Sequence, residues 1–87
     1  MKELFIKDFI RGLKKADAII INDGHVNTDF NFIGDMFHTS IEQISFEIDD
    51  IEVCEIVKDD FFQTIRIVLN NSNELFFKLF EFSPVQL

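Results

Sequence analysis

The sequence contains no tryptophan and no tyrosine, and only one cysteine, one proline and three glycines among its 87 residues. A lone thiol cannot form a disulfide within the chain, so the fold must be stable without one, as is typical of a reducing compartment. So few glycines make a phosphate-cradling loop hard to build, and the signatures of P-loops, dinucleotide-binding turns, serine hydrolases and dithiol redox sites are missing. We therefore expect a protein that is not an enzyme and that carries no cofactor.

Long apolar runs are missing as well. None approaches the ~20 residues that a transmembrane helix needs. Glu3 and Asp8 interrupt the N-terminal region, which therefore does not resemble a secretory signal peptide. These absences predict a cytoplasmic protein with no membrane partner, and the length predicts a single domain, 1–87.

Acidic residues outnumber basic ones and are unevenly distributed. The net charge is −8, but the first fifteen residues carry five basic and two acidic side chains, and the remainder carries three basic and fourteen acidic ones. A negative field of this size repels nucleic acid and attracts basic proteins. The expected partner is therefore a basic protein, with a nucleic-acid-binding enzyme as a specific example, and direct nucleic-acid binding is not expected.

The apolar pattern predicts one helix followed by strands. Residues 3–15 place apolar side chains on one stripe with a period near 3.6 and basic ones on the opposite face, which indicates an amphipathic helix. Residues 18–22 are β-branched and predict a buried strand, and Asn22-Asp23-Gly24 predicts a turn in which Gly24 takes a positive φ. Residues 25–32 alternate, with Val26, Thr28, Phe30 and Phe32 on the apolar face, so they predict the second strand of a hairpin.

Residues 34–43 have no clear period and predict an irregular connection. From residue 44 onward the alternation predicts a meander with a bend at Asp49-Asp50 and turns at residues 58–60 and 70–73. The fold class that we expect is α+β: one N-terminal amphipathic helix packed on an antiparallel sheet of five or six strands, a hairpin followed by a C-terminal meander.

The last predicted strand is apolar on both faces. Leu75, Phe77 and Leu79 alternate with a second row that Lys78 interrupts, Phe76, Phe80 and Phe82. One helix cannot cover both faces of such a sheet, so this second row predicts cover by the C-terminal tail or by another chain. Self-association into a homodimer through Phe76, Phe80 and Phe82 is therefore an alternative function.

Seven carboxylates fall within fourteen residues and form the main candidate site, a partner-binding acidic face: Glu47, Asp49, Asp50, Glu52, Glu55, Asp59 and Asp60. Carboxylates that repeat along a strand at roughly 6.6–6.8 Å can imitate a phosphate backbone and occupy a basic groove. The simpler interpretation is a charged strand edge that prevents edge-to-edge pairing. Metal binding is a third interpretation, although no EF-hand spacing is present.

His25, His38 and Cys54 are further candidates for a chemical role. His25 and His38, with Asp29 and Asp35 between them, could ligate a divalent metal in a small metal-dependent enzyme, but their spacing matches no metal motif. Cys54 lies beside two glutamates, whose charges would raise the pKa of its thiol and weaken it as a nucleophile, so we expect it to be structural.

The favoured function is thus a non-catalytic acidic protein-binding module, specifically an inhibitor. Small acidic single-domain proteins of this kind include phage anti-defence proteins (anti-CRISPR and anti-restriction inhibitors) and immunity proteins of nuclease toxins. This analogy rests on size and charge alone.

Overall fold

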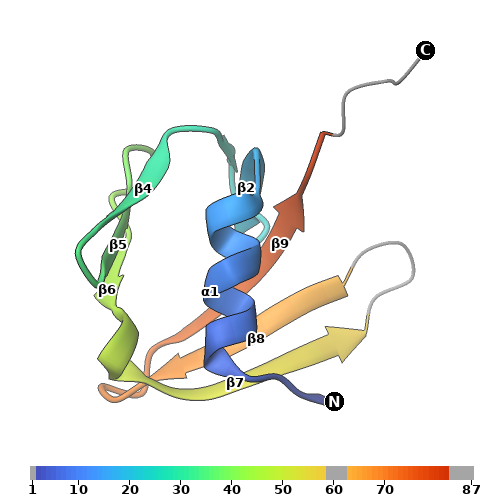
Figure 1. Cartoon of the computed structure of the whole chain (residues 1–87), viewed down its shortest axis with the longest axis vertical. Helices are drawn as coiled ribbons and strands as arrows, with labels where there is room; N and C mark the ends of the chain where they lie inside the picture. The colour runs from blue at the N-terminus through green and yellow to red at the C-terminus, as the bar shows by residue number, and fades with distance from the viewer. Residues whose placement is uncertain (1, 59–62, 83–87) are drawn as a thin grey trace.

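Two antiparallel sheets and one helix form the protein, whose computed structural model describes residues 2–58 and 63–82. The larger sheet has six strands in the order β1-β7-β8-β9-β2-β3, and the smaller has three in the order β4-β5-β6 (Figure 1). In chain order the elements are β1 Lys2–Glu3, α1 Ile6–Lys15, β2 Ala18–Ile21, β3 Val26–Asn27, β4 Phe30–Ile33, β5 Met36–Thr39, β6 Ser45–Glu47, the 3-10 helix η1 Ile48–Asp50, β7 Ile51–Lys58, β8 Gln63–Leu69 and β9 Glu74–Phe80. The predicted α+β class is confirmed, and the second sheet is an addition to it.

The helix begins three residues later than the sequence pattern suggests. Residues 2 and 3 pair with β7 as a short strand, and Phe5 stays extended at the N-cap, with φ −67° and ψ 135°. Pairing with a neighbouring strand therefore replaces the first helical turn. Phe9, Ile10 and Leu13 are buried, whereas Phe5, which the pattern assigns to the same apolar stripe, is 75% exposed.

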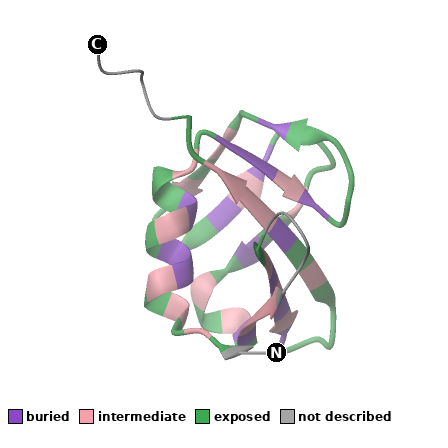
Figure 2. Cartoon of the chain, turned by 90° about the vertical axis from the view of Figure 1, so that its right-hand side faces the viewer, coloured by how far each residue is buried: buried purple, intermediate pink, exposed green. Residues whose placement is uncertain are grey.

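The core lies between the large sheet on one side and both α1 and the small sheet on the other. Phe77 of β9 joins all three, with ring centroids 5.2 Å from Phe9, 6.0 Å from Phe37 and 6.1 Å from Phe46. Figure 2 shows the buried positions alternating along the strands and following one side of the helix. The opposite face of the large sheet, which we call the outer face, is covered by no element among the residues described.

The predicted hairpin of residues 18–32 is only partly correct. Strand β2 pairs with β3, but β3 ends at Asn27, and Phe30–Ile33 joins the small sheet instead. The facing is reversed in β3, where Asn27 lies opposite Ile19 and is fully buried while Val26 is 54% exposed. It is as predicted for Phe30 and Phe32, which pack against the core. At the turn, Asn22 and Asp23 adopt positive φ (53° and 56°), and Gly24 does not.

Residues 34–43, predicted to be irregular, contain β5. Gly34, at φ +60°, and Asp35 form a tight turn that pairs Ile33 with Met36. Phe37 of this strand is fully buried against Phe32 and Phe46. Tertiary packing therefore stabilises a strand that the local sequence pattern does not predict.

The predicted strand pairing of the meander is confirmed for β7, β8 and β9 and is wrong before them, because β6 pairs with β5 in the small sheet. The predicted turn at residues 58–60 extends into residues that the structure does not describe. The bend at Asp49-Asp50 is present as η1. In the final hairpin Ile65 lies opposite Phe77 and Ile67 opposite Leu75, which confirms both the strands and the face that they bury.

Candidate functional site

The seven clustered carboxylates do not share one surface. Glu47, Asp49 and Glu52 are exposed around η1, where β6 ends and β7 begins, whereas Asp50 and Glu55 take up internal contacts. Asp59 and Asp60 lie outside the residues that the structure describes. The predicted acidic face is therefore smaller than its sequence run.

Asp50 links η1 to the turn between β8 and β9. Its carboxylate accepts hydrogen bonds from the Glu47 backbone N–H at 3.3 Å and from Asn70 Nδ2 at 3.1 Å. The Asn70 backbone N–H also donates to the Asp50 carbonyl at 2.8 Å. The Glu47 side chain in turn accepts a hydrogen bond from the Asp50 backbone N–H, so the two carboxylates cap η1 reciprocally. Asp50 thus supports the loop geometry and is less available to a partner than the exposed Asp49 and Glu52.

Glu55 points to the outer face and forms an ion pair there. Its carboxylate lies 2.9 Å from Arg66 Nη1, and Arg66 Nε lies 3.1 Å from Glu74. These two carboxylates raise the pKa of the Arg66 guanidinium, the Glu74 hydrogen bond being the larger cause, so the group stays charged. Glu3 of β1 lies directly opposite Glu55 and has no ion-pair partner among the described residues.

Asp35 joins the exposed carboxylates, although it lies outside the sequence run. The Ile48 backbone N–H donates to the Asp35 carbonyl at 2.9 Å, which holds the β4–β5 turn against η1. We define the acidic face as four exposed residues: Asp35, Glu47, Asp49 and Glu52. None of them has an ion-pair partner in the part of the chain that the structure describes. No local pattern could have identified Asp35.

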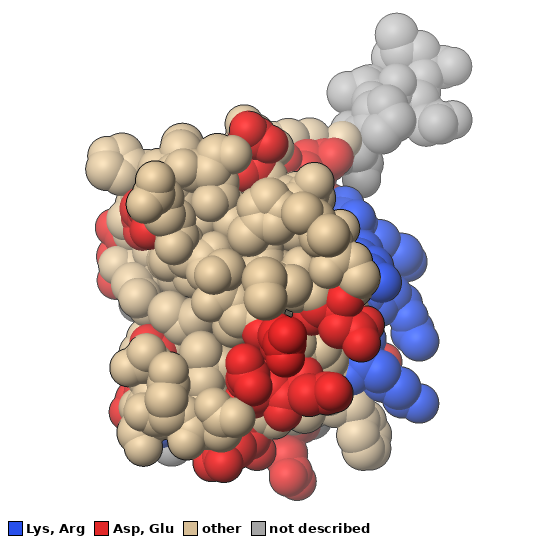
Figure 3. Space-filling view, turned by 90° about the vertical axis from the view of Figure 1, so that its left-hand side faces the viewer, with Lys and Arg blue, Asp and Glu red and all other residues tan. Residues whose placement is uncertain are grey.

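The acidic face lies close to a ridge of opposite charge. Figure 3 shows a cluster of carboxylates in the lower half of the view, beside the edge that carries the basic side chains, and other carboxylates scattered at the top and left. That ridge is the solvent side of α1, where the exposed basic residues are Lys7, Arg11, Lys14 and Lys15. Among the described residues the ridge forms one ion pair, Arg11 with Asp8, and this pair lies within the helix, so the ridge and the acidic face do not neutralise each other by contact.

A groove of about 640 Å³ opens beside the acidic face, between the β1–α1 connection and β7. We call it the β7 groove; its lining residues are Glu3, Leu4, Phe5, Ile6, Glu52, Val53, Cys54 and Glu55. Carboxylates and apolar side chains thus share its walls. Sequence reasoning missed this site because its two walls are about fifty residues apart in the chain.

Cys54 is not a nucleophile in this setting. Its side chain is 5% exposed, and burial, with a smaller effect from Glu55, raises the pKa of the thiol to about 11. The thiolate is the reactive form, and only a small fraction is ionised near neutral pH. The structural role predicted for Cys54 agrees with this burial.

We expect iodoacetamide to alkylate Cys54 at least about tenfold more slowly in the folded protein than in the denatured chain near pH 8, because the thiolate is scarce. Mass spectrometry of timed samples, with and without guanidinium chloride, measures both rates. Equal rates would show that the thiol is accessible and ionised.

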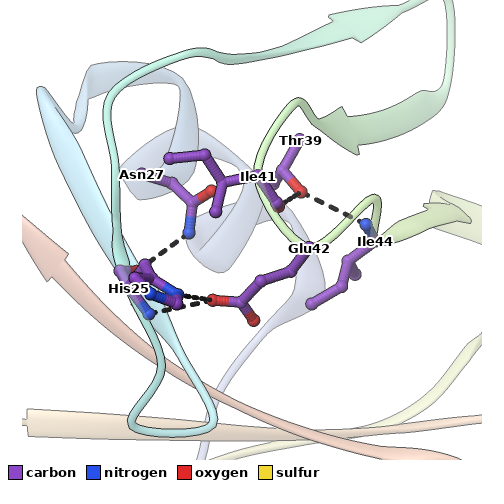
Figure 4. A network of polar contacts seen from close by, with 6 residues as sticks. All are labelled: His25, Asn27, Thr39, Ile41, Glu42 and Ile44. Carbon is purple, nitrogen blue, oxygen red and sulfur yellow. Dashed lines mark hydrogen bonds and ion pairs between the residues drawn. The ribbon is translucent and has the colours of Figure 1, made fainter.

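The two histidines are not brought together with carboxylates into a metal site. His25 contacts Glu42, which accepts a hydrogen bond from its backbone N–H at 2.9 Å and lies 3.5 Å from Nδ1 (Figure 4). His38 lies on β5, and no group of three potential ligands occurs among residues 2–58 and 63–82. A Cβ at Gly24 would lie 2.4 Å from the Glu42 carboxylate, so Gly24 leaves room for this contact.

The outer face contains the apolar row of β9. Phe76 is 36% exposed, Phe80 is half-buried, and Phe82, which follows the strand, is 66% exposed. Lys78 interrupts the row and forms an ion pair with Asp23 at 3.2 Å. The predicted exposure of Phe76 and Phe82 is confirmed. The predicted cover by the C-terminal tail falls on residues 83–87, which lie outside the described residues.

Helix α1, the α-helix of the described chain, is too short and too polar to cross a membrane. Comparisons of the chain with protein-family models, curated proteins and solved structures find no significant match.

Proposed function

We propose that this protein is a non-catalytic binding module that docks its acidic face on a basic protein. The observation that carries the proposal is the set of four exposed carboxylates, Asp35, Glu47, Asp49 and Glu52, without ion-pair partners among the described residues. A surface with unneutralised charge of one sign steers an oppositely charged partner toward it and selects against like-charged ones.

The partner class that suits this face is a nucleic-acid-binding protein. Such proteins carry basic grooves that neutralise phosphates, and carboxylates presented at a strand end and a 3-10 helix can take the place of those phosphates. The protein would then act as an inhibitor by occupying the groove. Because the chain has no tyrosine or tryptophan to serve as an anchor, charge has an unusually large share in the binding energy.

A pull-down from the source cell tests this proposal. The immobilised chain is loaded with lysate treated with nuclease, and the bound proteins are eluted with a salt gradient and identified by mass spectrometry. We expect a basic nucleic-acid-binding protein that elutes at moderate salt, because ionic contacts are screened as salt rises. Recovery of only acidic or salt-insensitive proteins would contradict the proposal.

A second candidate is a structural homo-oligomer that buries the outer face. It is favoured by the exposure of Phe76 and Phe82 on a sheet face that no described element covers. Sedimentation velocity over a range of concentrations separates it from the first candidate, because a chain that stays monomeric at the highest concentration is not a homo-oligomer.

A further inference from the structure

The edge of β7 is only partly paired. One side of this strand pairs with β8 from Ile51 to Lys58, whereas its other side meets only the two residues of β1, opposite Glu55 and Ile56. The Leu4 backbone N–H donates to the Cys54 carbonyl at 3.0 Å, and the chain then turns away into α1. Residues 51–53 therefore have no strand beside them on that side among the residues described, and the β7 groove lies along this edge.

The walls of the β7 groove combine apolar surface with negative charge. Phe5 and Val53 are 75% and 37% exposed, so both can contact a ligand. Glu3, Glu52 and Glu55 provide the charge. Lys7 is the nearby base, with Nζ 6.0 Å from the Phe5 ring centroid, and it lies outside the lining.

Glu3 and Glu55 form an unfavourable pair within the fold. Like charges directly opposite in an antiparallel ladder are destabilising. Arg66 relieves Glu55, but Arg66 also contacts Glu74, and Glu3 has no cation of its own among the described residues. A basic side chain supplied from outside would remove this repulsion.

We propose that the β7 groove binds an extended basic segment of the partner, which adds as a strand to the edge at residues 52 and 53, next to Ile51, whose backbone N–H already donates to the Ile48 carbonyl. Its backbone would pair with β7, one Lys or Arg would contact Glu3 and Glu52, and an alternate apolar side chain would lie against Phe5 and Val53. This inference rests on the proposed function and specifies the chemistry of the partner.

Charge decides against a second copy as the occupant. If two β7 edges paired, two glutamates at position 52 would come close together, and such inward charges disfavour edge-to-edge pairing. The same charges attract a basic strand, so the edge gains specificity by repelling the wrong partner.

A blocked hexapeptide of alternating valine and arginine is the probe. Titrated into ¹⁵N-labelled protein, it should give saturable shifts of the backbone amides at residues 3–6 and 51–54. Two control peptides are expected to bind at least about tenfold more weakly: one with glutamate for arginine, and one with every backbone nitrogen methylated, which cannot donate a strand hydrogen bond from either edge. Equal binding of the N-methylated peptide, or shifts elsewhere on the molecule, would overturn the proposal.

Two variants separate binding from folding. Glu3→Gln is expected to lower the affinity for the probe about tenfold, because the probe loses a carboxylate that its cation would contact. The same change should raise Tm by about 1–4 °C, because it removes the repulsion between Glu3 and Glu55. Phe5→Ser is expected to weaken the probe at least about fivefold, and Phe82→Ser, at a comparably exposed phenylalanine outside the groove, should not change its affinity. Unchanged affinity in Glu3→Gln, or a lower Tm, would overturn the proposal.

Failure of this inference can be distinguished from failure of the proposed function. If reversal of charge at Asp49 lowers the affinity for the partner while Glu3→Gln and Phe5→Ser do not, the partner docks on the acidic face but does not enter the β7 groove. If none of these variants weakens the partner, the acidic face is not a docking surface and both proposals are wrong.

Discussion

Replacing Phe77 with alanine is expected to lower the free energy of unfolding by about 3–5 kcal/mol. Phe77 is fully buried and contacts one aromatic ring from α1 and two from the small sheet. Its loss leaves a cavity where three parts of the core meet, and the rigid strands cannot close around it. Domains of this size have total stabilities of about 5–15 kcal/mol, so the loss removes a large share of the stability and the variant should unfold at a clearly lower denaturant concentration.

Phe76→Ala is the matched control, because it makes the same substitution at the preceding residue of β9. Phe76 faces outward and is 36% exposed, so we expect a loss of about 1 kcal/mol or less. Chemical denaturation followed by circular dichroism measures both variants. Similar losses for the two would mean that the outer face is as tightly packed as the core, which the described structure does not show.

Reversing the charge at both Asp49 and Glu52 is expected to lower the affinity for the basic partner by about 100- to 1,000-fold, which corresponds to roughly 3–4 kcal/mol of binding free energy. Both side chains are exposed, and neither has an ion-pair partner among the described residues, so the fold should tolerate lysine at each. The change replaces two attractions with two repulsions at the centre of the acidic face. Isothermal titration calorimetry with the partner from the pull-down measures the loss, and the salt dependence of Kd should also become shallower.

Glu81→Lys provides the control for long-range charge. Glu81 is exposed, follows β9, and has no ion-pair partner in the described part of the chain, so its reversal changes the net charge as much as Asp49→Lys does. We expect Glu81→Lys to lower the affinity for the partner no more than about threefold, since exposed charges beyond a Debye length are largely screened. If Glu81→Lys and Asp49→Lys have equal effects, the partner responds to the total charge and not to the acidic face.

The sequence by itself determined the elements whose information is local. The amphipathic period defines α1, the β-branched run defines β2, and the four polar residues after Leu69 define the turn of the last hairpin. The register of that hairpin also follows, because a shift by one residue would move Ile65, Ile67 and Phe77 from the core to solvent. The negative charge and the run of carboxylates are likewise properties of composition.

Only the tertiary structure decided which of those carboxylates remain free. Glu55 and Asp50 look equivalent to Asp49 in the sequence, yet Arg66 neutralises the first and Asn70 and the Glu47 backbone bind the second. Asp35 enters the acidic face because a backbone hydrogen bond joins two distant turns. Side chains on strands meet partners from other strands, and such partners cannot be read from local spacing.

Tertiary structure also decided the division into two sheets and the opening of the β7 groove. Residues 25–32 have one continuous alternation, but their two halves pair with different strands, β2 and β5. The predicted helix begins at residue 3, but residues 2 and 3 pair with β7 as a strand. In each case hydrogen bonds to a distant strand, together with the burial of Phe37 or the partial burial of Leu4 against the core, outweigh a local preference. Intrinsic propensities amount to only about 1 kcal/mol or less per residue.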